Sequence, residues 1–389
     1  MHTIDAAADA LDAVARDIHA RPELCYEERY AADRIAGELA RAGLAVERGA
    51  GGVETALRAR FGRTDGPRVA VLAEYDALPE IGHACGHNLI AAGALGAALG
   101  LHAVRDRLPG EVVFLGTPAE EGGGGKIRLI EAGLFEGLDA AMMFHPLDRT
   151  VLWQGALAMA RLDMTFRGRP AHAAAAPWDG SSALRAVIHM FNLVDSARVH
   201  LRDGARVHGI IVDGGQAVNI IPERAACAFS VRAPTAAYLE TVKDHVRRAA
   251  AAAALATGTT LELTEKQGYR DMRNNEPLAR RFGDKLAALG VQFADTDPSI
   301  GIGSTDMGDV SYVVPAIHPY VGICAPDEAF PHQHGFAARA AAPEGLRAMR
   351  AAAKAMALLA WDVLHDADLR RAAKTAFDAG ASRPHIVSK

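Results

Sequence analysis

A short segment of this sequence combines a carboxylate, a thiol and an imidazole in a spacing that suits a metal ion. Asp76 follows the apolar run Val69–Ala73, and the sequence Cys-Gly-His-Asn occupies residues 85–88. A cysteine and a histidine two positions apart can bind zinc or a similar divalent ion. Taken alone, such a pair is more often structural, because a buried cysteine usually behaves as a small hydrophobe. The chemistry therefore depends on which other residues join Cys85 and His87.

Further candidate ligands follow other apolar runs. The adjacent carboxylates Glu120 and Glu121 come after residues 112–116, and His145 comes after residues 139–144. Two adjacent carboxylates repel each other and favour a nearby cation. Because neighbouring side chains of an extended segment point to opposite sides, one could bind metal while the other acts as a general base. A solvated acidic loop and a packed core histidine are the plainer alternatives.

Two histidines far downstream, His332 and His334, are the last candidates. Together the clusters offer two ions the thiolate, imidazole and carboxylate ligands of a two-metal hydrolase. Four glycines after Glu121 do not form a phosphate loop, because that motif needs glycine at position 120 and serine or threonine at 127, where the chain has Glu120 and Ile127. We interpret these glycines as room for a substrate or for close backbone approach.

The predicted elements explain how these residues could meet. In the first part of the chain, predicted strands alternate with helices, and the candidate ligands follow the strands. The predicted strands span residues 53–61, 68–74, 112–116 and 139–144, and helices at 88–107 and 126–132 lie between them. This order predicts a doubly wound α/β domain, in which ligands bind beyond the carboxyl ends of parallel strands.

The pattern changes near residue 158. Strands are predicted at 158–167, 207–213, 225–231 and 259–266, with helices at 180–198 and 235–256. This β-α-β-β-α-β order is typical of a ferredoxin-like unit. The α/β pattern then returns, with a final helix at 343–364 and an aperiodic tail from about Gly380. We therefore predict a discontinuous catalytic, metal-binding domain, residues 1–157 and 271–389, and an inserted domain, residues 158–270.

The composition narrows the class of protein. The 389 residues are 50% hydrophobic and 23% charged, which is ordinary for a globular chain long enough for two domains. A net charge of −5 without a basic run argues against nucleic acid as a partner. The apolar stretch at 89–101 is too short to cross a membrane, and no signal peptide is recognisable. Four scattered cysteines show no disulfide framework, so a cytoplasmic location is expected.

Motifs along nearly the whole chain resemble those of peptidase family M20, the aminoacylase and carboxypeptidase-type metallopeptidases, in its amidohydrolase subfamily. They are HARPE at 19–23, YDALP at 75–79, HACGHN at 83–88, GTPAEE at 116–121, GRPAH at 168–172, NIIP at 219–222, VRAPT at 231–235, GSTDMGD at 303–309 and HQHGF at 332–336. The resemblance implies a zinc-peptidase-like α/β catalytic domain and an inserted ferredoxin-like α+β domain that serves as lid and dimerisation domain.

The resemblance also implies roles for individual residues at the metal centre. Cys85 would bridge two divalent ions, zinc or manganese. His87 and Glu121 would complete one metal site, and His145 and His332 the other. His332 is preferred to His334 because the family's ligand stands four residues before an aromatic residue, here Phe336.

Other implied roles concern catalysis and the substrate. Glu120 would be the general base, and Asp76 would orient a metal ligand. His172 would stabilise the oxyanion, reaching the site of the other subunit of a homodimer. Asn219 and Arg232 would contact the substrate or its carboxylate.

Three motifs depart from the commoner pattern of the subfamily. Residues 72–76 read LAEYD, residue 88 is asparagine, and residues 303–309 read GSTDMGD. These variants are similar to the branch that contains aminobenzoyl-glutamate hydrolase and dipeptidases that cleave β-alanyl-lysine-type peptides. We therefore expect a binuclear metal-dependent amidohydrolase that releases an amino acid from an N-acyl or N-aroyl amino acid or from a dipeptide. A metal-dependent phosphoesterase and a non-catalytic binding protein on the same fold are the alternatives.

Overall fold

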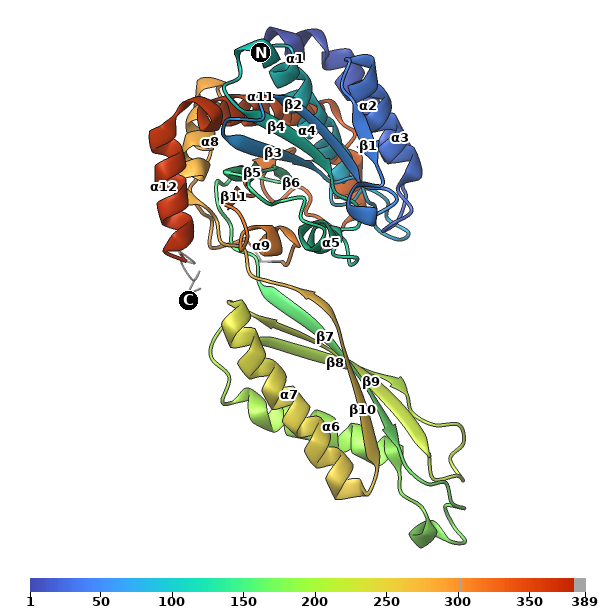
Figure 1. The fold of residues 1–389 in the computed structure, drawn as a ribbon. Coiled ribbons are helices and arrows are strands. Elements are labelled where there is room, and N and C mark those ends of the chain that lie inside the picture. Colours follow the sequence, from blue (N-terminus) through green and yellow to red (C-terminus); the bar gives the residue numbers. More distant parts are fainter. Residues whose placement is uncertain (301–302, 381–389) are drawn as a thin grey trace. The chain divides into compact units, whose positions relative to one another are not determined.

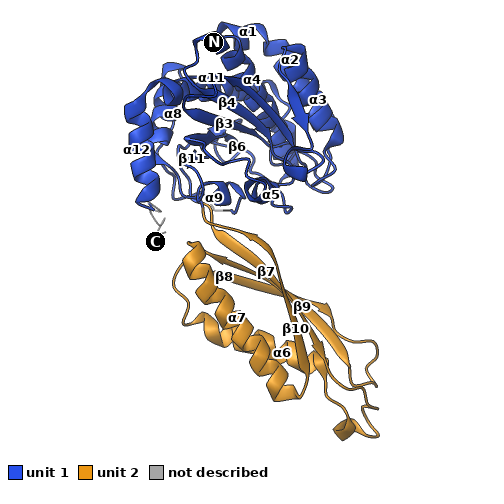
Figure 2. Cartoon of the chain, viewed as in Figure 1, with its two compact units in different colours: residues 1–155, 272–383 blue, residues 156–271, 384–389 orange. Residues whose placement is uncertain are grey.

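The computed structural model describes residues 1–300 and 303–380, and the chain divides into two compact units (Figure 2). One unit comprises Met1–Gly155 and resumes at Met272, and the other comprises Ala156–Asp271. The second unit is therefore inserted into the first. Most of the aperiodic tail, from residue 381, lies outside the described residues. No helix of the described residues is both long and apolar enough to span a membrane.

A six-stranded sheet forms the centre of the first unit (Figure 1). In spatial order its strands are β1 (Val46–Arg48), β2 (Leu57–Gly62), β4 (Glu111–Gly116), β3 (Arg68–Ala73), β5 (Ala140–Met142) and β11 (Ala316–Ile317). The last four of these run parallel, whereas β2 joins β4 antiparallel and β1 joins β2 antiparallel. The sheet is therefore mixed, although its parallel part is the α/β arrangement that the sequence predicts.

Helices pack against this sheet and against one another. The most buried is α4 (His87–His102), which contacts β3, α2 and α11 and is almost entirely apolar. Its glycines permit close packing, since a Cβ at Gly93 would lie 2.5 Å from Cε1 of Phe144. The other helices of this group are α1 (His2–Ala6), α2 (Ala8–Ala20), α3 (Arg29–Arg41), α8 (Glu276–Ala288), α11 (Pro343–His365) and α12 (Ala367–Asp378).

Short elements carry several chemically important residues. Strands β6 (His145–Leu147) and β12 (Tyr320–Gly322) form a separate parallel pair. Helices α5 (Gly125–Glu131), α9 (Met307–Val310) and α10 (His334–Arg339) lie in the same unit, as do the single 3-10 turns η1 (Ala50–Gly52) and η2 (Arg105–Arg107). After α9, residues 311–313 form turns, and only Ala316–Ile317 pair as strand β11. Helix α12 was not predicted.

The inserted unit has the order β7 (Ala158–Arg167), α6 (Ala183–Arg198), β8 (Arg206–Asp213), β9 (Arg224–Ala233), α7 (Ala236–Thr257) and β10 (Thr260–Tyr269), with a 3-10 turn η3 (Pro177–Asp179) before α6. Its antiparallel sheet has the spatial order β10-β7-β9-β8, which confirms the predicted ferredoxin-like fold. Both helices pack on this sheet (Figure 1), and strand residues alternate between buried and more exposed positions, as in β7. Its role as lid and dimerisation domain stays a prediction.

Candidate metal centre

The candidate ligands of the first unit meet where its parallel strands end. Asp76 follows β3, Glu120 and Glu121 follow β4, and His145 begins β6 just after β5. Because β4, β3 and β5 are neighbours and parallel, their carboxyl ends share one edge of the sheet. His87 is the first residue of α4, so the start of this helix faces the same edge. The sheet thus brings together residues far apart in the sequence.

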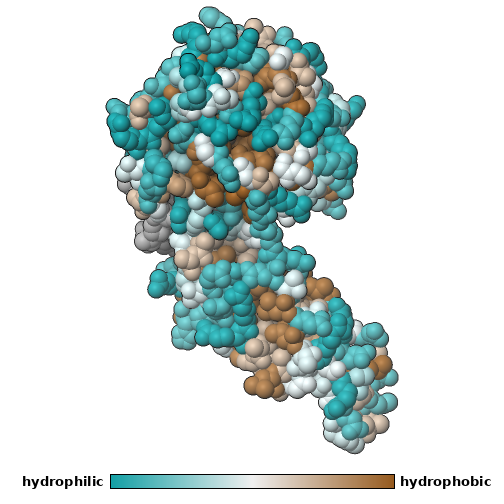
Figure 3. Space-filling view, in the orientation of Figure 1, coloured by the Kyte–Doolittle hydropathy of each residue, from teal (hydrophilic) through white to brown (hydrophobic). Residues whose placement is uncertain are grey.

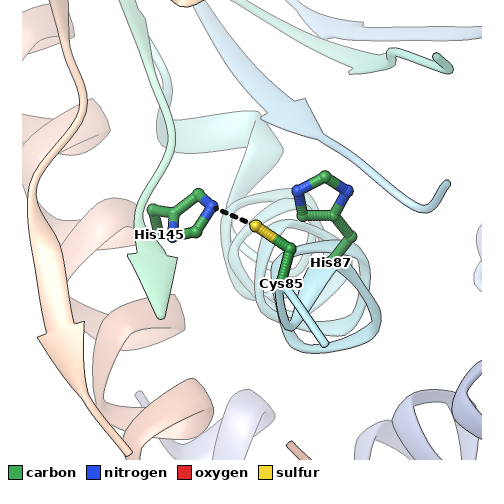
Figure 4. Close-up of side chains that lie close together, drawn as sticks. All are labelled: Cys85, His87 and His145. Carbon is green, nitrogen blue, oxygen red and sulfur yellow. Dashed lines mark hydrogen bonds between the residues drawn. The ribbon is translucent and has the colours of Figure 1, made fainter. Parts of the chain in front are cut away.

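Donor atoms of these residues form three groups, each with atoms within 4.8 Å of one another. Cys85, His87 and His145 form the first group, shown in Figure 4, where the Cys85 sulfur points toward His145. The Cys85 Sγ lies 3.4 Å from Nε2 of His145. The second group joins Cys85 with Glu121 and His332, and the third joins His87 with both glutamates.

This grouping bears on the pairing of ligands that the family resemblance implied. None of the three groups contains both His145 and His332, whereas Cys85 belongs to two of them. The third group keeps His87 with Glu121, as the resemblance implied, so the division of the ligands between two ions stays a prediction. Among the described residues, these groups include His332 and not His334, although both side chains are exposed.

Polar atoms without partners test whether a cation fits this cluster. Nε2 of His87 and Oε1 of Glu121 are buried, accept or donate no hydrogen bond and lie 3.8 Å apart. Nε2 of His332 lies 3.5 Å from the same glutamate oxygen. Burying such atoms unpaired is costly, whereas a divalent ion between them would satisfy all three. Imidazole, thiolate and carboxylate are the donor set of zinc and related ions, so the residues fit the group.

Hydrogen bonds orient both buried imidazoles. Nδ1 of His87 lies 3.0 Å from both Oδ1 and the backbone oxygen of Asp76. Nδ1 of His145 lies 2.7 Å from the backbone oxygen of Pro146. Since Nδ1 donates in each case, Nε2 of each ring carries the free lone pair that can bind metal. Asp76 also accepts the backbone N–H of Glu121 at 2.8 Å, so one carboxylate fixes two candidate ligands.

The thiol of Cys85 shows why a cation is needed here. Although the start of a helix favours a thiolate, burial and the negative charge of Glu121 raise the pKa of Cys85 well above its ordinary value. A metal ion binds only the deprotonated form. A bound ion would supply positive charge that stabilises the thiolate.

Backbone geometry at two glycines and one alanine shapes the site. Gly86 has a φ of +80°, and a Cβ there would lie 2.9 Å from Cγ of Pro146. Gly125 allows an even closer approach, since its Cβ would lie 1.8 Å from the backbone oxygen of Pro118. These contacts agree with the interpretation of the glycine run as a place of close backbone approach. Ala119 has a φ of +61°, and its N–H donates to Oε1 of Glu28 at 2.9 Å.

Glu120 has the environment of a proton acceptor and donor. Its side chain is buried, and burial together with the charges of Glu121 and Glu74 raises the pKa of Glu120 well above its ordinary value. A carboxylate with a raised pKa holds a proton more readily near neutral pH than an exposed glutamate does. This property suits a group that takes a proton from water and returns it to a leaving amine.

The three candidate residues of the inserted unit do not lie together. His172 and Asn219 are neighbours, because residue 172 pairs with Ile220 and the N–H of Ala173 donates to the backbone oxygen of Asn219. Both side chains are exposed. Arg232 lies near the opposite end of β9, where it pairs with Met159 of β7.

Several residues beside the metal centre were missed by sequence reasoning. The rings of Tyr320 and His318 lie tilted beside His145, with centroids 5.4 and 5.3 Å from that imidazole. Lys126 is fully buried between Glu74 and Asp306. Charged residues within predicted buried segments, such as Glu74 at the end of β3, were the available signal.

Comparison with known proteins decides the family. The model of peptidase family M20/M25/M40 matches residues 70–360. The chain belongs to this family. A mouse Xaa-Arg dipeptidase is 40% identical over 93% of this chain and 87% of its own length, and the human Xaa-Arg dipeptidase is 38% identical over 94% and 88%. A p-aminobenzoyl-glutamate hydrolase subunit of Escherichia coli is 34% identical over 72% of this chain and 62% of its own length.

Solved structures share the whole fold of this M20 member. A dinuclear metal binding peptidase from Bacillus subtilis aligns with a TM-score of 0.73 at 23% identity, over 93% of this chain and 99% of that one. An aminobenzoyl-glutamate utilization protein from Klebsiella pneumoniae aligns with a TM-score of 0.75 at 20% identity, over 93% and 97%. The predicted family and the predicted fold, an α/β domain with an inserted ferredoxin-like domain, are thereby confirmed. The chain is a hydrolase of the peptidase class, as the sequence predicts.

Proposed function

We propose that this M20 member is a dinuclear metal-dependent amidohydrolase whose preferred substrates are dipeptides. The observation that carries the proposal is the buried cluster in which His87 Nε2 and Glu121 Oε1 lack partners, directly beside Glu120. Cys85, His87, Glu121, His145 and His332 would hold the two ions. Thiolate and imidazole ligands suit zinc, and the carboxylates also suit manganese.

Each residue of the site has a proposed task. Bound ions of this kind polarise a carbonyl and lower the pKa of water. Glu120 accepts a proton from the attacking water and passes it to the leaving amine. Asp76 keeps His87 in the tautomer that leaves Nε2 free. His172 stabilises the oxyanion, and Asn219 and Arg232 bind the substrate or its carboxylate.

The choice of dipeptides rests on the relatives. The two Xaa-Arg dipeptidases match this chain almost from end to end, whereas the p-aminobenzoyl-glutamate hydrolase subunit matches over a smaller share. We therefore propose dipeptides with a basic C-terminal residue as the first substrate class to test. N-acyl and N-aroyl amino acids are the second class.

A homodimer through the inserted unit is part of the proposal. Strand β8 is the edge of its sheet, and this edge is apolar, with Ile210 65% and Val212 60% exposed. An exposed apolar edge strand favours pairing with another strand. Figure 3 shows that hydrophobic residues also reach the visible surface of this unit.

Within the unit, His172 lies at the end of the sheet remote from residues 156 and 271, where the chain enters and leaves. We propose that His172 serves the site of a second copy.

Hydrolysis by metal-stripped protein, before and after addition of zinc or manganese, tests the function. The panel contains Xaa-Arg and β-alanyl dipeptides, p-aminobenzoyl-glutamate, N-acetyl and N-benzoyl amino acids, and an aryl phosphate. We expect metal-restored cleavage of dipeptides and none of the phosphate. Cleavage of the phosphate alone would favour a phosphoesterase, and two bound ions without any turnover would favour a binding protein. A protein that binds no ion would refute the proposal.

A further inference from the structure

A second buried ionic cluster lies beside the proposed metal ligands. Nζ of Lys126 lies 2.5 Å from Oε1 of Glu74 and 2.6 Å from Oδ1 of Asp306, and the backbone N–H of the lysine donates to Oδ2 of Asp306 at 2.9 Å. All three side chains are fully buried. Although burial alone would lower it, the pKa of Lys126 lies above its ordinary value because Asp306 and Glu74 face it. One cation between two carboxylates leaves an excess of one negative charge.

The excess charge faces the metal centre through one atom. Oε2 of Glu74 is buried and makes no hydrogen bond, since Lys126 occupies only Oε1. This free oxygen lies 3.5 Å from Nε2 of His87, which is also without a partner. Oε1 of Glu121, the third such atom, lies 3.8 Å from the same nitrogen. Two carboxylate oxygens, one of Glu74 and one of Glu121, therefore face Nε2 of His87, the nitrogen through which that ring would bind metal.

A positive charge near Oε2 would offset the cost of burying Glu74 in this way. An ionised carboxylate oxygen that is buried without a partner is strongly destabilising. When His87 binds metal, its proton lies on Nδ1 toward Asp76, so Nε2 offers Glu74 no hydrogen bond. Since Lys126 is already shared with Asp306, an ion bound at His87 would then face this oxygen with a positive charge.

We propose that Glu74 is an additional carboxylate of the metal centre, which faces the ion at His87 through Oε2 and strengthens binding at that site. Lys126 holds this carboxylate through its other oxygen, Oε1. The inference rests on the metal centre of the proposed function and adds a residue to it. The two-residue spacing between Glu74 and Asp76 places both at the end of β3, with Asp76 on one side of the imidazole and Glu74 on the other.

A matched pair of variants separates a metal-binding role from a purely structural one. Glu74→Gln and Asp306→Asn each remove one negative charge, and each leaves Lys126 with one carboxylate, so both chains should fold. They differ because only Glu74 faces His87. The measurements are the number of ions retained after dialysis and the affinity for Zn²⁺ in competition with a chelating indicator. The absorption spectrum of the Co²⁺-loaded protein reports the ligand environment independently of activity.

We expect E74Q to bind one of its two ions at least about tenfold more weakly and to change the Co²⁺ spectrum, as removal of a group that supports metal ligands commonly does. D306N should stay within about threefold of the parent affinity. Parent-like binding of both ions by E74Q would overturn the inference, and so would equal losses in E74Q and D306N, which would mark the cluster as structural. If E74Q is too unstable for these assays, its Tm is measured with and without Zn²⁺. A smaller rise in Tm than in the parent and in D306N supports the inference, and an equal rise overturns it. A parent protein that binds no ion would refute the proposed function itself.

Discussion

Oε1 of Glu28 accepts the backbone N–H of Ala119 at 2.9 Å, one residue before the proposed general base Glu120. The same carboxylate accepts the N–H of Tyr26 and the hydroxyl of Thr55. Ala119 adopts a left-handed conformation, which is unfavourable for a residue with a Cβ. Glu28 therefore holds the strained turn at Ala119 that precedes the proposed general base, Glu120.

Glu28 should make the stability of the metal-stripped protein depend on pH. Burial raises the pKa of Glu28 from 4.5 to about 7. Between these values the unfolded chain has lost a proton that the folded chain keeps, so the free energy of unfolding falls as the pH rises, by roughly 3 kcal/mol in total. Glu28→Gln cannot titrate and should lack this decrease. Urea unfolding at pH 5 and pH 8 measures the effect, and a parallel pH dependence in both proteins would contradict it.

Glu120→Gln should bind both ions and lose turnover by about 10²- to 10⁴-fold, because the amide cannot transfer the proton. Glu121→Gln is the matched control, since it changes the adjacent residue and should lose metal instead. Metal content by elemental analysis and kcat on the best dipeptide distinguish the two. Retained turnover in E120Q would remove the general-base role, and retained metal in E121Q would remove the ligand role.

Gly86→Ala should weaken metal binding and lower stability by more than the conformational cost alone. At a positive φ an added Cβ costs about 1–2 kcal/mol, and here the Cβ would also lie 2.9 Å from Pro146, between the two ligands Cys85 and His87. Gly52→Ala is the control, with a φ of +77° and no atom within 4 Å of the added Cβ. Thermal unfolding with and without Zn²⁺ compares the variants. Equal losses in both would show that the contact with Pro146 is unimportant.

Ile210→Asp should convert a dimer into monomers by placing a charge on the β8 edge. Leu255→Asp is the control, because Leu255 is 86% exposed but lies near the end of α7, away from the strand edge. Sedimentation velocity gives the mass of each variant. If His172 serves a second copy, monomeric I210D should also lose activity while it keeps its metal. A fully active monomer would contradict that role.

Elements with a strong local pattern were predictable from the sequence. The bounds of β3 and β7 were predicted almost to the residue. Strand β3 is buried on both faces and reads as a continuous apolar run, whereas β7 is buried on one face and alternates. The antiparallel attachment of β2 was not predictable in this way, since direction within a sheet depends on tertiary pairing. Short strands such as β12 have too few residues for a pattern.

The candidate site was predictable where a ligand stands in a recognisable motif, as Cys85 and His87 do. The grouping of His145 with these two residues depends on which strand ends are neighbours, which no local pattern records. Glu28 and Glu74 were missed for a similar reason. Their partners, Ala119 and Lys126, lie far along the chain, and only the folded structure brings them into contact.

The position of the inserted unit has a consequence for synthesis of the chain. Four of the proposed ligands precede Ala156, whereas His332 follows the entire insertion. At typical ribosomal rates the interval between His145 and His332 lasts on the order of ten to forty seconds. During that time the nascent chain carries an incomplete set of ligands. The full set can therefore assemble only after His332 has been synthesised.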